Sequence, residues 1–130
     1  MKAISIRQPW AWAIIHAGKD VENRTWNTHY RGLLAIHAPA KRKSIDWWPR
    51  GVIRPEEEDC PLSAIIGVVE LTDVVERMRS KWFGGPYGFV FVNPQPLPLP
   101  IHCKGGLGLW KLPPNVLRSI RRQLSLSSGK

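Results

Sequence analysis

Three charged side chains that follow one another near the start of the chain can bind an anion or a base edge, or carry acid–base chemistry. They are Lys19, Glu22 and Arg24. Lysine and arginine donate hydrogen bonds to phosphates and base edges, and the arginine does so with a planar fork. A carboxylate between them can orient the arginine or activate water as a general base. The same three groups can also form a salt bridge that only joins two elements, although surface pairs of this kind contribute only ~0–1 kcal/mol.

The elements around these residues place them where a short helix ends and a strand begins. Pro9 suits a helix start because its missing N–H is unpaired there in any case, and Gly18 suits a left-handed helix end. The residues between them are apolar on nearly every side, so we predict a buried helix over 9–17, followed by a strand over 20–26.

Side chains alternate between the two faces of a strand, so Glu22, Arg24 and Trp26 should share one face and Val21, Asn23 and Thr25 the other. A charged pair that faces a core is costly without full pairing. We therefore expect Lys19, Glu22 and Arg24 to line a cleft open to solvent. Either Trp26 or His37 should form part of its wall.

The order of segments along the chain resembles the ASCH domain family (activating-signal-cointegrator homology), whose signature is a G-x-K-x-x-E-x-R-type motif. Gly18 directly precedes Lys19 here, one residue closer than in that signature. Further segments that look like the family's strands are 5–10, 30–38, 64–71 and 107–112. The resemblance implies an α+β fold, a small PUA-like β-barrel of five to six strands with short helices packed on it. It extends over one domain, residues 1–130, and the cointegrator type is more similar than the small bacterial hydrolases.

The remaining elements are predicted from turn residues and apolar runs. Strands are expected over 3–7, 32–38, 64–75, 87–92 and 107–112, with a bulge or bend at Gly67. A short helix is expected over 40–48, and a second one after Pro113-Pro114, with Leu117, Ile120 and Leu124 facing inward. The alternating prolines over 94–100 exclude a central strand, so this segment should be an extended edge or a connecting loop.

Charge is distributed unevenly along the 130 residues. Residues 1–76 contain ten Lys or Arg and ten Asp or Glu, whereas residues 77–130 contain nine Lys or Arg and no acid, so the net charge of +9 belongs to the second part. Such an excess favours a polyanionic partner. No apolar run is long enough to span a membrane. Cys60 and Cys103 have no metal-ligand spacing, so we expect reduced thiols in a cytoplasmic protein, with no metal and no cofactor.

Tryptophans beside basic residues are candidates for stacking on unpaired bases while the cations meet phosphates. Trp10, Trp12 and Trp110 lie inside predicted elements and are expected in the core. Arg118, Arg121 and Arg122 should lie on one exposed helix face near Lys81 and Lys104. The full set of candidate nucleic-acid-binding residues is Lys19, Arg24, Trp26, Lys41, Arg42, Lys43, Trp47, Trp48, Lys81, Lys104, Arg118, Arg121 and Arg122.

Three functions follow from these residues and the resemblance. The first is binding of RNA or single-stranded DNA by a monomer. The second, implied by the bacterial members of the family, is an amidohydrolase acting on N4-acetylcytidine-type nucleosides, with Lys19 and Glu70 in the family's lysine and glutamate positions and Glu22 where its threonine nucleophile would be. The third is a protein-interaction module whose basic face meets a partner's acidic surface.

Overall fold

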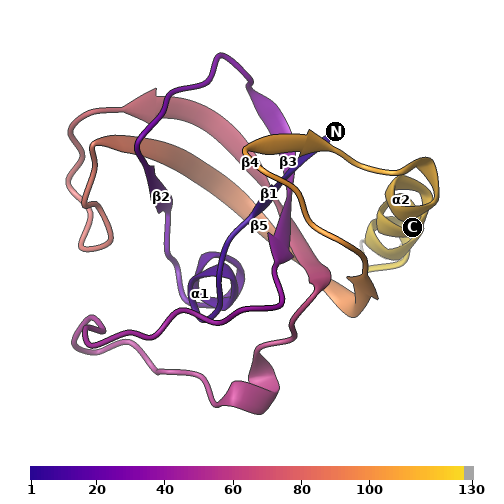
Figure 1. The fold of residues 1–130 in the computed structure, drawn as a ribbon, viewed down its shortest axis with the longest axis horizontal. Helices are drawn as coiled ribbons and strands as arrows, with labels where there is room; N and C mark the ends of the chain where they lie inside the picture. The colour runs from indigo at the N-terminus through magenta and orange to yellow at the C-terminus, as the bar shows by residue number, and fades with distance from the viewer. Residues whose placement is uncertain (128–130) are drawn as a thin grey trace.

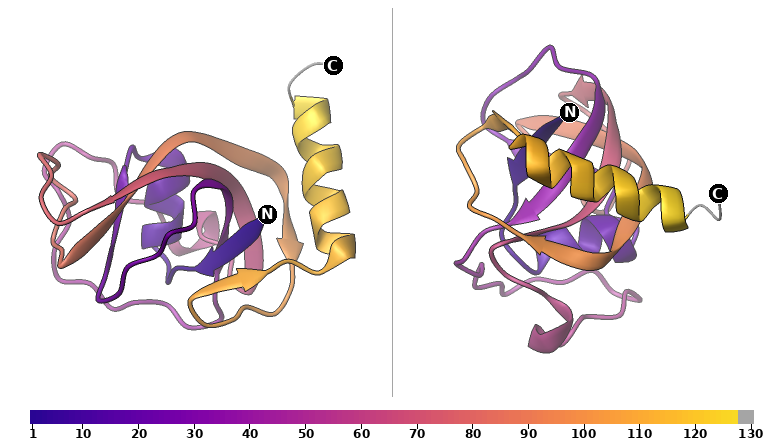
Figure 2. Two further views of the ribbon diagram at one scale, coloured as in Figure 1. Left: turned by 90° about the horizontal axis from the view of Figure 1, so that it is seen from above. Right: turned by 90° about the vertical axis from the view of Figure 1, so that its right-hand side faces the viewer.

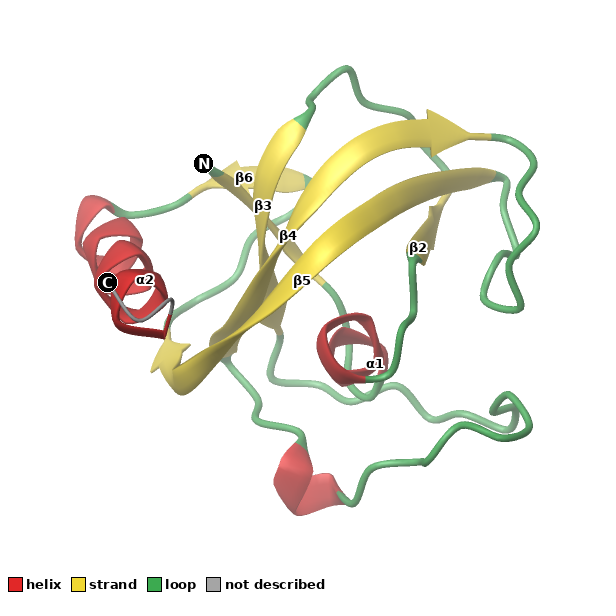
Figure 3. Ribbon diagram, turned by 180° about the vertical axis from the view of Figure 1, so that it is seen from behind, coloured by secondary structure: helices red, strands yellow, loops and turns green. Residues whose placement is uncertain are grey.

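One curled six-stranded sheet, with a helix on each of its faces, forms the body of the protein (Figures 1 and 3). The computed structural model describes residues 1–127. The strand order is β2-β5-β4-β3-β1-β6, in which β1 and β3 are parallel and the other pairs antiparallel. The elements are β1 (Lys2–Ser5), α1 (Trp10–His16), β2 (Val21–Arg24), β3 (Gly32–Ala38), a 3-10 turn (Glu57–Asp59), β4 (Ala64–Val75), β5 (Tyr87–His102), β6 (Leu109–Lys111) and α2 (Pro114–Ser127).

The two helices cover opposite faces because apolar side chains alternate along the central strands. Ile4, Leu34 and Ile36 join the core cluster that α1 enters through Ile14 and Ile15. Ala3 and Ala35, on the other face, belong to the cluster that α2 enters through Val116 and Ile120. Both faces of the middle of the sheet are therefore buried. The predicted α+β fold, a small barrel of five to six strands with helices packed on it, is confirmed, and its six strands form a curled half-barrel.

Several predicted elements have the expected bounds. β3 and β4 span the predicted residues, and the register of β4 against β5 shifts around Gly67, where the bulge or bend was predicted. The first helix is one residue shorter at each end than predicted. Buried Gln8 supports its start, because its Oε1 accepts a hydrogen bond of 2.8 Å from the backbone N–H of Trp12.

The predicted helix over 40–48 is wrong, because this segment is an irregular loop. Its polar groups bond to distant parts of the chain instead of to one another. The backbone N–H of Lys43 donates to the Gln8 carbonyl at 2.8 Å, and the guanidinium of Arg42 donates to the carbonyls of Cys60 and Glu57. These non-local contacts outweigh a weak local helix preference.

The proline-rich segment is an edge, as predicted, but it is a strand and not a connecting loop. β5 continues through it to His102 and pairs with β4 at 95–96 and again at 101–102, whereas β2 covers only Tyr87–Val90 on the other side. Prolines are tolerated here because the side of β5 that faces away from β4 is a free sheet edge, which needs no N–H donors. The N–H of Leu99 donates to the side chain of Gln123 on α2 at 3.0 Å.

Within the described residues, neither helix is both long and apolar enough to cross a membrane.

Candidate functional site: a tryptophan-lined cleft

The turn after α1 folds the chain back, so that Lys19 lies against the end of the helix. Gly18 has φ = 73°, and the N–H of Lys19 donates back to the Ala13 carbonyl at 3.1 Å. The Lys19 side chain is only 5% exposed. Its Nζ donates to the Val21 carbonyl at 2.5 Å and to Glu22 Oε1 at 3.2 Å. Burial of this cation is tolerated because both bonds are close and one acceptor is charged.

Glu22 lies between two cations, and Arg24 holds it in place. The Nε and Nη2 atoms of Arg24 both lie 3.0 Å from Glu22 Oε2. The same Nη2 donates to the Ser5 carbonyl at 2.9 Å. Since β2 is an edge strand and three strands separate it from β1 in the sheet, Arg24 links the two sides of the open half-barrel. Its fork is used for this link, and the predicted role of Arg24 in lining the cleft is not met.

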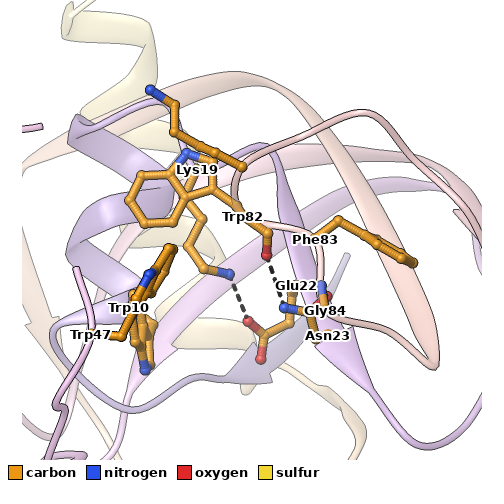
Figure 4. Close-up of a pocket in the computed structure, with 9 residues that line it drawn as sticks. Trp10, Lys19, Glu22, Asn23, Trp47, Trp82, Phe83 and Gly84 are labelled. Carbon is orange, nitrogen blue, oxygen red and sulfur yellow. Dashed lines mark hydrogen bonds and ion pairs between the residues drawn. The ribbon is translucent and has the colours of Figure 1, made fainter. Parts of the chain in front are cut away.

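A cleft of about 470 Å³ opens above the Lys19–Glu22 pair. In Figure 4, Trp10 and Trp47 lie to one side of this pair, and Asn23 and Phe83 lie to the other. The lining residues are Trp10, Lys19, Glu22, Asn23, Trp47, Lys81, Trp82, Phe83 and Gly84.

Four indole rings build the aromatic wall. Trp10 stacks on Trp48 with ring centroids 5.4 Å apart, and Trp82 meets both rings edge-on. Trp47 is 52% exposed at the mouth, whereas Trp82 is buried. The ammonium of Lys19 lies 5.8 Å from the Trp10 ring centre, within cation–π range. Trp10 was predicted in the core, but it is half-buried and its ring forms part of the cleft.

Asn23 fixes the opposite wall. Its Nδ2 donates to the Trp82 carbonyl at 3.0 Å, and its Oδ1 accepts from the N–H groups of Gly84 and Gly85 at 2.8 and 3.0 Å. Asn23 was expected on the face of the strand opposite Glu22, but both residues line the cleft. The one signal in the sequence for the role of Asn23 was the Gly84-Gly85 turn, because the backbone N–H groups of such a turn can donate to the side-chain amide of a distant residue.

Neither aromatic residue predicted for the wall is there. Trp26 packs edge-on against buried Phe89, with ring centroids 5.1 Å apart. His37 is buried on the other side of the barrel, where its Nε2 donates to the Cys103 carbonyl at 2.9 Å and its Nδ1 accepts from the Ser5 hydroxyl at 3.0 Å. The carbonyl can only accept, which places the ring proton on Nε2. Desolvation lowers the pKa of His37, although the bond to the Cys103 carbonyl opposes this effect.

Of the basic loop before Pro49, only Trp47 reaches the cleft. Lys41 and Lys43 are exposed, while Arg42 is occupied by the carbonyls of the 57–60 turn. Trp48 is half-buried behind Trp10 and donates from Nε1 to the Val52 carbonyl at 3.0 Å. The predicted stacking surface is therefore reduced to the exposed ring of Trp47, because Trp48 instead packs behind Trp10.

Glu70 does not join Lys19. Its neighbours Val69 and Leu71 belong to the core on the α1 side, so Glu70 points to the other face of the sheet, where it accepts a bond of 3.4 Å from Asn93. The predicted catalytic set of Lys19, Glu22 and Glu70 is thus not assembled, because alternation along β4 separates its third member.

The basic residues of the second half of the chain are also separated. Arg118, Arg121 and Arg122 are exposed on α2, as predicted. The segment between β4 and β5, which carries Lys81, lies at the opposite end of the molecule from α2 (Figures 1 and 2). The expectation that Lys81 lies near the three arginines is wrong, because the long strands β4 and β5 separate these two ends. Lys104 is exposed just after β5.

Cys60 and Cys103 are free thiols, and burial raises the pKa of both. Among the described residues, no three His, Cys, Asp or Glu side chains are placed to hold a metal ion.

Comparison with known proteins agrees with this architecture. The chain is 28% identical over 138 aligned positions to activating signal cointegrator 1 of Homo sapiens and equally to that of Mus musculus. Each alignment covers 93% of this chain but only 24% of the relative, so the chain spans about a quarter of their length. The crystal structure of ASCH from Zymomonas mobilis superposes with a TM-score of 0.60 at 18% identity, covering 93% of both chains. The ASCH domain profile matches residues 4–89, and the chain belongs to the ASCH domain family.

Proposed function

We propose that this protein binds single-stranded nucleic acid by taking an unpaired base into the tryptophan-lined cleft. The observation that carries the proposal is the combination of an exposed indole, Trp47, with the Lys19–Glu22 pair at the floor of one cleft. Flat aromatic walls stack on any base, and a cleft of about 470 Å³ is within the usual range for small-ligand sites.

The floor offers hydrogen bonds to a base edge. Lys19 uses two of its three ammonium hydrogens within the protein. Glu22 Oε2 accepts twice from Arg24, whereas Oε1 accepts once from Lys19 and keeps a lone pair. One donor and one acceptor therefore remain side by side. Every base carries adjacent donor and acceptor groups on its Watson–Crick edge, and this edge is accessible only when the base is unpaired.

We expect phosphates to bind at the mouth of the cleft and not at its floor. Glu22 offsets part of the positive charge of Lys19 and Arg24, so the floor suits a neutral base more than a backbone phosphate anion. Lys81 is exposed at the rim of the cleft, and it is the cation placed to meet the backbone of the bound strand. RNA and single-stranded DNA share the chemistry that this site uses.

A binding measurement with Trp47→Ala tests the proposal. Fluorescence anisotropy of a labelled mixed-sequence single strand should show a loss of about 5- to 150-fold in affinity, since stacking is worth ~1–3 kcal/mol per base. Ile53→Ala is the matched control, because Ile53 is 84% exposed in the same loop and does not line the cleft.

The same strand annealed into a duplex should compete poorly with the free strand. Equal binding by wild-type protein and Trp47→Ala, or equal competition by the duplex, would contradict binding of an unpaired base in this cleft.

A further inference from the structure

A second hollow lies at the other end of the molecule, beside α2, and it differs in chemistry from the tryptophan-lined cleft. It is an open groove of about 600 Å³ between α2 and the first residues of β1 and β3. Figure 2 shows α2 lying across this end of the sheet. The groove-lining residues are Met1, Tyr30, Arg31, Gly32, Leu33, Ile120, Arg121, Leu124 and Ser125.

The floor of this α2 groove is largely aliphatic. Leu33 is 50% exposed although it belongs to β3, a strand whose next five residues are buried. It points to the same face as Ala35, which α2 covers through its apolar side. An exposed leucine at the edge of a buried core, flanked by a helix, is the kind of surface that a partner's apolar side chain covers.

The rim of the α2 groove is positive. Arg121 lines one side, and Arg118 lies one helical turn before it on the same flank of α2. Arg31 lines the other side and is 40% exposed. Its Nη1 donates to the carbonyls of Thr28 and Tyr30 at 2.9 and 2.8 Å, and its Nη2 lies 3.8 Å from Asp73 Oδ1, so its charge is only weakly offset by that carboxylate. Glu70 lies on the same sheet face, opposite Leu33 in the strand pair, and its carboxylate accepts a hydrogen bond from Asn93.

We infer that the α2 groove is a docking site for an acidic segment of a partner protein that inserts an aliphatic side chain over Leu33. Charge complementarity supplies the acidic character of the partner, since arginines stand on both sides of the groove. The aliphatic floor favours a protein segment over nucleic acid, because bases need flat aromatic faces and only Tyr30 offers one here. This inference concerns a different surface from the cleft and does not depend on the proposed function.

The test uses the full chain and two synthetic helical peptides in fluorescence anisotropy. Both carry glutamates at the same positions, and one has leucines along one face where the other has alanines. The leucine peptide should bind, and Arg121→Glu and Leu33→Ser should each weaken it on the order of tenfold. Arg77→Glu, an equal charge change at an exposed site between β4 and β5, should leave its affinity within about twofold. Both altered positions are exposed, and unchanged thermal unfolding would verify the fold.

Three results would overturn the inference. The first is absence of binding by the leucine peptide, and the second is equal binding by the alanine peptide, which would reduce the contact to general charge attraction. The third is that Arg121→Glu and Leu33→Ser weaken binding of a single-stranded oligonucleotide but leave binding of the leucine peptide unchanged. That result would assign the groove to nucleic acid.

Discussion

At the scale of single residues, the floor of the cleft depends on a series of polar contacts that begins at Ser5, outside the cleft. Lys19 is held by Glu22, Glu22 by Arg24, and Arg24 by the carbonyl of Ser5 on another strand. Arg24 is thus a positioning residue, whose guanidinium makes three contacts that no other side chain could make together.

Replacing Arg24 by Lys should destabilise the protein although the charge is kept. Lysine lacks the planar fork, so at least one hydrogen bond to Glu22 or Ser5 is lost, and the free energy of unfolding should fall by ~1–3 kcal/mol. Urea denaturation measures this loss. Arg77→Lys at an exposed position is the control and should stay within about 0.5 kcal/mol of wild type. Equal stability of the two variants would mean that the Arg24 contacts do not matter for folding.

His37 should make stability depend on pH in the acidic range. Desolvation lowers its pKa in the folded state, so the folded protein binds this proton more weakly than the unfolded chain does. Stability is then fully present above the ordinary histidine pKa of about 6.5 and is lost progressively as pH falls through that value.

Denaturation at several pH values measures this dependence, and NMR titration of the His37 ring in the wild-type protein checks its cause. Desolvation also lowers the pKa of His16, so His16→Gln should be titrated beside the wild type. A His37 ring that titrates above the ordinary value would refute the assignment.

At the scale of elements, close approach of α1 to the sheet determines where Lys19 can lie. Gly67 of β4 makes this approach possible. A Cβ there would stand 2.5 Å from Ile15 Cδ1 on α1 and 2.8 Å from the backbone oxygen of Gln95. A side chain at position 67 would push α1 outward. The turn that carries Lys19 follows α1 directly, so the floor of the cleft would move with the helix.

Gly67→Ala should cost ~1–3 kcal/mol, because one of the two close atoms is backbone and cannot rotate away. The measurement is thermal or chemical unfolding, together with oligonucleotide affinity, which should fall as the floor shifts. Gly84→Ala is the comparison, since a Cβ there meets its nearest atom at an ordinary 3.6 Å. If Gly67→Ala proves as stable as Gly84→Ala, the packing of α1 is looser than the structure shows.

At the scale of the whole molecule, the excess positive charge does not form one surface. Lys81 belongs to the end with the tryptophan-lined cleft, and the arginines of α2 belong to the opposite end (Figure 2). A short oligonucleotide bound at the cleft cannot also contact α2. The cleft end and the α2 end of the molecule are therefore expected to bind different partners.

Salt dependence of oligonucleotide binding separates the two ends. Lys81→Gln should lower the slope of log affinity against log salt by ~1, since one phosphate contact is removed. Changing Arg118, Arg121 and Arg122 together to Gln should leave the slope for a short strand unchanged. A triple variant that flattens the slope more than Lys81→Gln does would show that α2, and not the cleft, holds the nucleic acid.

The sequence by itself determined the local elements and the family. Pro9 and Gly18 bracket α1, alternation and β-branched residues define β3 and β4, and the ordered segments identify the ASCH domain. The short spacing from Lys19 to Arg24 also brought those charged groups together, because helix ends and strand faces follow from local backbone geometry.

Only the tertiary structure decided which side chains share the cleft. Trp10, Trp47 and Trp82 are far apart in the chain and meet because the sheet curls and two loops fold back on α1. Strand alternation in β4 sends Glu70 away from Lys19, and Asn23 gains its role only when the Gly84-Gly85 turn arrives. The loop over 40–48 likewise follows distant carbonyls instead of its own helix preference. Local preferences are worth tenths of a kcal/mol per residue, and burial of several indoles outweighs them.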